Sequence, residues 1–536
     1  MTVPDQYVTL SNGLMKSSVK GNGGLRTDHW VMDKKHAPYL FFMGVGDYAV
    51  VKDKWRNIDV DYYVEKEYEP YAKQIFGNTP EMMEFFSKRL NYDYPRPKYA
   101  QMTARDYVAG AMENTTAVLH QESAQQKSGD LIDENRWEET IAHELFHHWF
   151  GDLVTAESWS NLTVNESFAN YSQYLWNEHK YGKDLADYGL MKESRGYMMD
   201  PANPTKDLVR FNYHSREDMF DGVSYNKGGA ILHMLRNYLG DDAFFAGLTD
   251  YLKTNEYGTG EAHQLRLSLE KVSGRDLNWF FNQWFYGSGH PKLSYTTNFE
   301  PVKKQVTVTI TQMQVGQNYQ FPLAIDVYEN GKPSRKNVWV DAEEKNNFTF
   351  SVSKNPELVN INADGVLLGE FTDSKTADQY FTQFQNSKEF LSRHLAVENA
   401  TENVAKNPAF LKILVAGLKD PNFRIRMKSL SGLDLAKPDQ AKAALSEVEK
   451  MAAHDQKTLV QGAAISALGK TKDKKYLPLF EKAIGAVSNA VKANALTGMS
   501  AVDPARVIAR ADKIDLEGAS DDLIAELLPI NVKNKI

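Results

Sequence analysis

The 536-residue sequence contains no cysteine. This absence excludes disulfides and thiolate metal sites, so any metal site must use histidine and carboxylate ligands. No apolar run approaches the ~18–20 residues of a membrane-spanning helix, and the N-terminus lacks the basic-then-apolar pattern of a signal peptide. The compartment stays open, because a cysteine-free chain suits both the cytoplasm and a bacterial cell envelope.

The sequence also lacks a basic run. Its 62 Lys and Arg residues are outnumbered by 70 Asp and Glu residues, which gives a net charge of −8. This balance argues against a nucleic-acid-binding surface. Apolar residues make up 42% and charged residues 25% of the chain, as in ordinary globular proteins. The length is too great for one core and predicts about two to four domains.

Changes in hydrophobic period divide the chain into four parts. Residues 1–53 read as strands and turns, and we expect them to form the last part of an all-β domain. Residues 54–291 are mainly helical and end at the breaker sequence GSGHP. Residues 292–372 alternate with period two and contain the hairpin signal Asn330-Gly331, which predicts a small β-sandwich. Residues 373–536 are rich in Ala, Lys and Leu and again helical.

The second part opens with a mixture of elements. The segment Glu81–Leu90 has helical apolar spacing and follows Pro80, which favours a helix start. The segments Lys98–Met102 and Tyr107–Ala111 read as strands that precede the sequence GAMEN. We therefore expect a multidomain α+β protein in which strands lead into a mainly helical domain.

The last part contains a weak repeat. The segments LSGL (430–433), ISAL (465–468) and LTGM (496–499) recur at steps of 35 and 31 residues, within predicted helices. Paired helices at such a period are typical of solenoids, so we predict a HEAT-like α-solenoid. The final residues NVKNKI have no capping character, and we expect the array to continue beyond this chain.

The sequence HELFHHW carries the clearest chemistry. His143 and His147 are four residues apart and share one face of a helix, with Glu144 between them. This HExxH pattern is typical of zinc metallopeptidases, in which two imidazoles bind the metal and the glutamate activates water. A catalytic zinc needs a third protein ligand, and Glu166 in the following helical segment is the candidate. His148 points about 100° away on the helix and is interpreted as packing or supporting a ligand.

Together with their surroundings, these residues resemble the gluzincin zinc aminopeptidases, the family of aminopeptidase N and leukotriene hydrolase. The resemblance rests on HExxH with eighteen residues between its second histidine and a glutamate, the upstream GAMEN at 110–114, and Tyr225 within SYNKG. The stretch VSGRDLNWFFNQWFYGSGHP (272–291) resembles the end of the family's catalytic domain. The resemblance covers nearly the whole chain and implies a thermolysin-like fold for its mainly helical catalytic domain.

The resemblance also implies roles. His143, His147 and Glu166 are similar to the ligands of one zinc ion per chain, and Glu144 to the general base and acid. Tyr225 resembles the tyrosine that stabilises the oxyanion, although the sequence alone favours a packed tyrosine there. The substrate-binding motif consists of Gly110, Ala111, Met112, Glu113 and Asn114, in which Glu113 resembles the carboxylate that binds a free α-ammonium group.

Two departures from the family pattern stand out. Ser167 follows the third ligand where the family often has glycine, and most of the family's N-terminal β-domain is expected to be absent from this chain. The predicted activity is hydrolysis of the N-terminal residue from peptides with a free N-terminus. Two alternatives stay open: another gluzincin hydrolase, such as an endopeptidase or epoxide hydrolase, and a catalytically silent interaction scaffold. The sequence does not indicate the oligomeric state.

Overall fold

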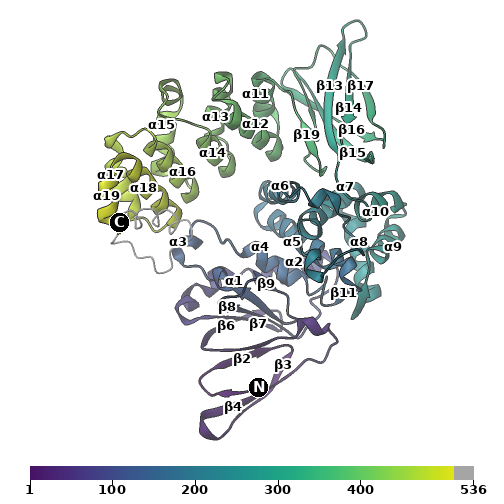
Figure 1. Cartoon of the computed structure of the whole chain (residues 1–536), viewed down its shortest axis with the longest axis vertical. Helices are drawn as coiled ribbons and strands as arrows, with labels where there is room; N and C mark the ends of the chain where they lie inside the picture. The colour runs from purple at the N-terminus through teal and green to yellow at the C-terminus, as the bar shows by residue number, and fades with distance from the viewer. Residues whose placement is uncertain (512–536) are drawn as a thin grey trace.

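The computed structural model describes residues 1–511. Figure 1 shows the N-terminal strands (residues 1–46) at one end of the molecule and the strand domain (292–372) at the other. The central domain (48–287) lies between them, and the helical domain (377–511) arcs from the strand domain back toward the central domain. The chain is thus a multidomain fold of helices and strands, as predicted. Among the helices of residues 1–511, none combines the length and apolarity needed to cross a bilayer.

The N-terminal strands form two small sheets. β1 (Thr2–Pro4), β4 (Leu25–Val31) and β3 (Leu14–Lys20) make one, and β2 (Val8–Ser11) pairs with β5 (Met43–Gly46) in the other. Their largest shared core is a small cluster in which Leu10 packs with residues of the next sheet, namely Tyr63, Ala100, Met102 and Ala117. The strands are therefore held by the central domain as much as by one another.

The central domain begins with a mixed five-stranded sheet of order β6-β7-β8-β10-β9. Its strands are β6 (Tyr48–Trp55), β7 (Ile58–Glu65), β8 (Lys98–Ala104), β9 (Ala111–Met112) and β10 (Ala117–Gln121). β7, β8 and β10 run parallel, whereas β6 and β9 are antiparallel edge strands. β6 crosses residue 53, so this strand joins the segment before that boundary to the central sheet.

The prediction of a strand over Tyr107–Ala111 is wrong. The backbone of Asp106 (φ 58°) and Gly110 (φ 77°) is left-handed, and Val108 is 97% exposed. Left-handed positions at both ends turn the chain rather than extend it. The apolar residues Tyr107 and Val108 imitate a strand in the sequence, but only Ala111–Met112 pairs with a neighbour.

Helices build the rest of the central domain. They are α1 (Ala72–Phe76), α2 (Thr79–Arg89), α3 (Ser128–Leu131), α4 (Glu138–Phe146), α5 (Thr163–Tyr181), α6 (Lys183–Met199), α7 (Gly228–Leu239), α8 (Asp241–Asn255), α9 (Ala262–Ser273) and α10 (Asn278–Trp284). The predicted helix over Glu81–Leu90 corresponds to α2, with Pro80 in its first turn, where no backbone N–H is needed. A short strand pair, β11 (Val154–Ala156) with β12 (Gly258–Gly260), links the halves of this region.

The strand domain consists of two sheets. One has the order β17-β14-β13-β19 and the other β16-β15-β18. The strands are β13 (Lys292–Glu300), β14 (Gln305–Gln312), β15 (Phe321–Glu329), β16 (Lys332–Val340), β17 (Lys345–Ser351), β18 (Leu358–Ile361) and β19 (Glu370–Thr372). Every second residue of β14 is buried, as its period-two pattern requires. The buried faces of both sheets join the core of the central domain in one apolar cluster.

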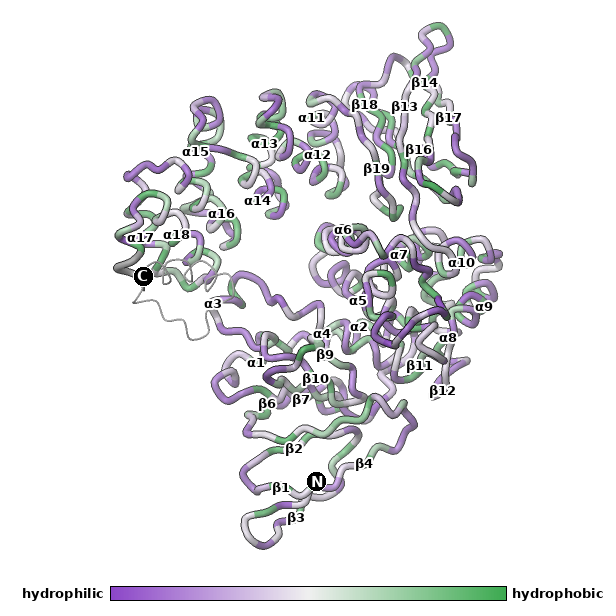
Figure 2. Tube along the Cα trace, in the orientation of Figure 1, coloured by the Kyte–Doolittle hydropathy of each residue, from purple (hydrophilic) through white to green (hydrophobic). Residues whose placement is uncertain are grey.

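The helical domain has its own core. It comprises α11 (Ala377–Asn386), α12 (Phe390–Asn403), α13 (Leu411–Gly417), α14 (Phe423–Ser431), α15 (Pro438–His454), α16 (Thr458–Gly469), α17 (Leu477–Ile484), α18 (Asn489–Val502) and α19 (Pro504–Ala511). Hydrophobic and hydrophilic residues mix along these helices in Figure 2. The three repeated segments fall on or at the end of α14, α16 and α18, which pack in series. A Cβ on Gly469 would lie 2.5 Å from the Cα of Gly498, so glycine permits the close α16–α18 approach.

The helical domain contacts the central domain at both ends of its arc. Near its start, Arg195 of α6 forms a bidentate ion pair with Glu398 of α12. Near its end, Ser488 and Asn489 at the start of α18 hydrogen-bond to Asp133 and Asp130 beside α3. The predicted continuation of this domain over 512–536 lies outside the described residues.

Candidate active site

The candidate site is built on the antiparallel pair α4 and α5. The acidic residues Glu138 and Glu139 stand in the first turn of α4, where they complement the helix dipole. They also accept hydrogen bonds of 2.7 Å from Trp176 and Asn177 near the end of α5. These contacts fix α5 against α4, so the start of α5 lies beside the end of α4.

This packing brings the three predicted ligands together. His143 Nε2 and His147 Nε2 lie 3.3 and 3.4 Å from the same oxygen, Oε2 of Glu166. All three side chains are buried, and one potential ligand atom from each lies within 4.8 Å of the others. Two nitrogens from α4 and its end and one oxygen from α5 thus face a common point.

The donor set fits zinc. His147 Nδ1 lies 2.9 Å from the carbonyl oxygen of Phe150, which fixes the tautomer and leaves Nε2 free to coordinate. Glu166 Oε2 is buried and has no hydrogen-bond partner among the described residues. Two imidazoles and one carboxylate are a common ligand set for catalytic zinc, with a further position left to water.

Two more carboxylates stand beside the ligands. Glu113, Glu144 and His147 also have polar atoms within 4.8 Å of one another, and all three side chains are buried. Burial raises the pKa of the Glu144 carboxyl well above its usual range, and burial likewise raises the pKa of Glu113. Burial opposes a charge on His147, but the carboxylates of Glu113 and Glu166 outweigh it and raise the pKa of this imidazole. The field at this point therefore attracts positive charge.

The GAMEN sequence forms the rim of the sheet next to these carboxylates. Within residues 1–511, β9 (Ala111–Met112) pairs only with β10, so its other side is an open sheet edge. Gly110 has φ 77° and its carbonyl accepts from Gln121 N, which anchors the turn into the strand. Asn114 turns the chain out of β9, and its carbonyl accepts from Ala117 N. An extended peptide could add to this edge as a further strand.

Tyr225 also lines the cavity beside the ligands. It lies in a single π-helical turn, Val223–Lys227, and its ring stacks on His143 with centroids 6.0 Å apart. Burial, followed by the nearby carboxylates of Glu166 and Glu113, raises the pKa of its hydroxyl, which therefore stays protonated as a hydrogen-bond donor.

Ser167 has a specific place in this arrangement. Its hydroxyl oxygen lies 2.7 Å from the carbonyl oxygen of Ser224, the residue before Tyr225. A Cβ on Gly228 would lie 1.9 Å from Ser167 Oγ, so glycine at 228 leaves room for the serine. The departure from the family pattern thus supplies a contact between the two helices that carry Glu166 and Tyr225.

His148 is not a ligand. Its Nε2 accepts a hydrogen bond of 2.9 Å from Thr116 N, and its Nδ1 lies 3.3 Å from the Glu144 carbonyl. Lys98 Nζ donates to the Thr116 carbonyl in the same turn. These bonds connect the HExxH helix with the turn that follows GAMEN, as the interpretation of His148 as a supporting residue anticipated.

Sequence reasoning missed Tyr39. It lies in the segment 1–53, to which the sequence assigned no part in the site, but its hydroxyl accepts a hydrogen bond of 3.3 Å from Asn165 Nδ2 beside the third ligand. The hydroxyl also interacts with the Glu113 carboxylate, where it opposes the effect of burial on the pKa of Glu113. Nothing in the local sequence signals this role, because the N-terminal strands meet the site only in the folded protein.

The site opens into a cavity of about 700 Å³. Residues outside the predicted set contribute much of its wall, including Tyr39, Trp137, Trp159, Gln173, Arg216 and Phe220. Trp159 lies between Tyr39 and Phe220, with ring centroids 6.0 and 5.9 Å away. The cavity therefore contains the candidate metal ligands and the acidic side chains beside them, together with several aromatic side chains.

Comparison with known proteins gives the class of this arrangement. Residues 75–284, which include all the candidate site residues from Gly110 to Tyr225, match the peptidase family M1 domain. This match agrees with the resemblance to the aminopeptidase N group.

Several curated relatives align with the same region. The chain is 31% identical over 268 residues to Tricorn protease-interacting factor F2 of Thermoplasma acidophilum, over 48% of this chain and 34% of that protein. It is 29% identical over 332 residues to aminopeptidase N of Mus musculus, over 57% of this chain and 33% of that protein. The chain thus spans about a third of the length of these relatives.

One solved structure shares the fold over almost the whole chain. This is the structure titled as Legionella pneumophila aminopeptidase A in complex with aspartic acid. It has a TM-score of 0.75, with 18% sequence identity, and the likeness covers 98% of this chain and 65% of that one. At 18% sequence identity, this likeness shows a shared fold.

Proposed function

We propose that this chain is a zinc aminopeptidase that removes the N-terminal residue from peptides. The observation that carries the proposal is the position of Glu113, whose carboxylate lies within 4.8 Å of polar atoms of Glu144 and His147. A fixed anion next to the reacting groups binds a free α-ammonium group and lets only the first peptide bond reach them.

His143, His147 and Glu166 would hold one zinc ion. Zinc, when bound, would supply a Lewis acid that polarises the scissile carbonyl and lowers the pKa of water. The remaining steps belong to the protein. Glu113 binds the ammonium group, and β9 aligns the substrate backbone along its open edge.

Glu144 acts first as base and then as acid. It takes a proton from the attacking water, whose oxygen bonds to the carbonyl carbon. Tyr225 donates a hydrogen bond to the resulting oxyanion. The C–N bond then breaks, and Glu144 transfers its proton to the departing amine nitrogen. Burial raises the pKa of the Glu144 carboxyl, which supports this role, because a more basic carboxylate holds the proton that it takes from water until the amine leaves.

The proposal extends to the domain organisation. Residues 54–291 would form a thermolysin-like catalytic domain after the 1–53 remnant, residues 292–372 a β-sandwich, and residues 373–536 a HEAT-like helical domain. The series packing of α14, α16 and α18 supports the repeat assignment.

Two substitutions test the activity. Glu144→Gln should abolish hydrolysis of aminoacyl arylamides while bound zinc, measured by metal analysis, stays near one per chain. Glu113→Ala should raise KM for substrates with a free N-terminus far more than it changes kcat. Normal turnover by Glu144→Gln would contradict the mechanism.

Blocked substrates separate the alternatives. Efficient cleavage of N-acetylated peptides would favour an endopeptidase. Epoxide hydrolysis without peptide cleavage would favour an epoxide hydrolase. A zinc-free protein with no activity after zinc is added would favour a scaffold. Each substrate is assayed with and without a chelator.

A further inference from the structure

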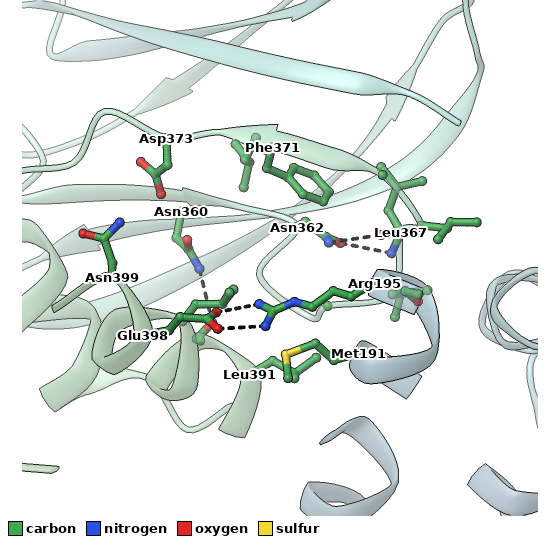
Figure 3. A pocket seen from close by; sticks show the side chains of 18 of the residues that line it. Met191, Arg195, Asn360, Asn362, Leu367, Phe371, Asp373, Leu391, Glu398 and Asn399 are labelled. Carbon is green, nitrogen blue, oxygen red and sulfur yellow. Dashed lines mark hydrogen bonds and ion pairs between the residues drawn. The ribbon is translucent and has the colours of Figure 1, made fainter. Parts of the chain in front are cut away.

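A second cavity lies where three domains meet. It has a volume of about 500 Å³ and is bounded by α6 of the central domain, β18 and β19 of the strand domain, and α11 and α12 of the helical domain. Figure 3 shows side chains from these elements converging on it. It shares no lining residue with the cavity at His143, Glu144 and Glu166. It is therefore a separate cavity, without a role in the proposed reaction.

Apolar side chains form much of its wall. They come from all three domains and include Met191, Met198, Leu367, Phe371, Leu391 and Leu395. Phe371 and Leu395 are 36% and 44% exposed, so part of this apolar surface faces solvent. A wall of this kind suits the body of a small apolar molecule.

Most polar groups of the cavity are already paired. Arg195 donates to both carboxylate oxygens of Glu398, at 2.8 and 2.5 Å (Figure 3). Lys375 lies 2.6 Å from Asp373 and donates to the Asn360 side chain at 2.8 Å. Because both cations of the wall have anionic partners, the cavity offers no free positive charge to an anionic ligand.

Among the carboxylate and amide side chains of the wall, two keep an acceptor without a partner. Gln383 is 1% exposed, and while its Nε2 donates to the Ser392 carbonyl at 2.8 Å, its Oε1 has no partner among the described residues. A buried amide oxygen without a donor is costly unless a ligand or water satisfies it. The side chain of Glu402, at the exposed part of the wall, makes no hydrogen bond or ion pair within residues 1–511, and its charge acts on Arg195 from a distance. A hydrogen-bond donor would satisfy the Gln383 oxygen, and a positively charged donor would pair with the Glu402 carboxylate.

We propose that this cavity is a binding site for a small organic amine: an aromatic or aliphatic body with a protonated amino group. The apolar wall takes the body, and the ammonium N–H groups donate to the unpaired acceptors, Glu402 and Gln383. A bound amine contacts all three domains at once, and so stabilises their present arrangement.

Equilibrium dialysis with three indoles of one body and different charge tests the site. The probes are tryptamine, the neutral alcohol tryptophol and the anion indole-3-acetate. The full chain carries Glu113→Ala, so that the proposed ammonium-binding carboxylate of the active site cannot capture the amine. Tryptamine should bind about tenfold more tightly than tryptophol, and indole-3-acetate most weakly. Equal binding of all three probes would overturn the proposal.

Two exposed positions locate the binding. Leu395→Trp narrows the cavity and should weaken tryptamine binding about tenfold, whereas Leu267→Trp, at a similarly exposed leucine on α9, should leave it unchanged. Glu402→Gln should weaken tryptamine about threefold without affecting tryptophol, with Glu344→Gln on the strand domain as its control. If Leu395→Trp leaves the affinity for tryptamine unchanged, the amine binds elsewhere and the proposed site is rejected.

Gln383→Leu tests the buried acceptor. It removes the unpaired oxygen but also the bond to Ser392, so its thermal unfolding is measured first. In a folded variant, the preference for tryptamine over tryptophol should fall. An unchanged preference would remove Gln383 from the site, while the two exposed variants still decide whether the site exists.

Discussion

The hydroxyl of Ser167 donates a hydrogen bond of 2.7 Å to the carbonyl oxygen of Ser224 and so connects the helix of Glu166 to the turn that carries Tyr225. We predict that Ser167→Ala lowers kcat about fivefold, the effect of one lost hydrogen bond, with little change in KM. The reason is that Tyr225 contributes in the transition state. Thr249→Val on α8 removes a buried hydroxyl that donates to the Leu90 carbonyl, outside the cavity, and serves as control. Equal kcat losses in both variants would argue for a general packing effect.

Tyr39 is predicted to orient Glu113. Tyr39→Phe removes the hydroxyl that interacts with the Glu113 carboxylate and accepts from Asn165, so KM for aminoacyl arylamides should rise about threefold to tenfold. Zinc content should stay unchanged. The control is Tyr48→Phe, which removes a hydroxyl that donates to Thr103, outside the cavity. A KM equal to that of the unmodified protein would show that Glu113 needs no such support.

Removal of metal should destabilise the central domain. A chelator leaves Glu166 Oε2 facing two imidazoles without a cation, and we expect a fall of several degrees in Tm. Zinc should restore the Tm, whereas magnesium should not, because two of the three donor atoms are nitrogens. Differential scanning calorimetry measures both. Glu166→Gln should respond weakly to the chelator, and a response as large as in the unmodified protein would contradict the ligand assignment.

The N-terminal strands should be sensitive to acid through Asp28. The Arg26 guanidinium, with Ser18 and Thr9, holds the pKa of this carboxyl below its ordinary value of 3.8. A depressed folded-state pKa contributes stability that is complete above pH 3.8 and is lost as the pH falls toward the folded pKa. Asp28→Asn should therefore destabilise these strands by about 2 kcal/mol at neutral pH, and by much less in strong acid. Hydrogen exchange of residues 1–46 measures it; a pH-independent difference would contradict the ion pair.

Two glycines should respond to alanine in opposite directions. Gly110 has φ 77°, a left-handed backbone, so Gly110→Ala should cost about 1 kcal/mol and raise KM by displacing β9. Gly189 lies within α6, where an added Cβ meets no atom closer than 4.0 Å. Gly189→Ala should stabilise the protein by about 0.5–1 kcal/mol. Urea unfolding of both variants checks the signs, and a stabilising Gly110→Ala would exclude the strained turn.

The local sequence pattern was sufficient to predict the elements whose buried side chains follow a regular period. The period-two alternation of β14 and the helical spacing of α2 follow from side-chain periodicity, so the strand character of 292–372 and the approximate bounds of α2 were predicted. The segment Tyr107–Ala111 failed because two left-handed residues, Asp106 and Gly110, override its apolar content. Backbone handedness at non-glycine positions leaves little trace in composition.

The sequence by itself determined the residue types of the candidate metal site. His143 and His147 share a helix face because of their spacing, and Glu166 was a candidate through chemistry. The tertiary structure alone decided that Tyr39 reaches Glu113, that Ser167 supports Tyr225, and that three domains enclose a second cavity. The physical reason is sequence separation: a contact between residues tens or hundreds of positions apart depends on how α4, α5, α6 and α12 pack, and no local pattern encodes that packing.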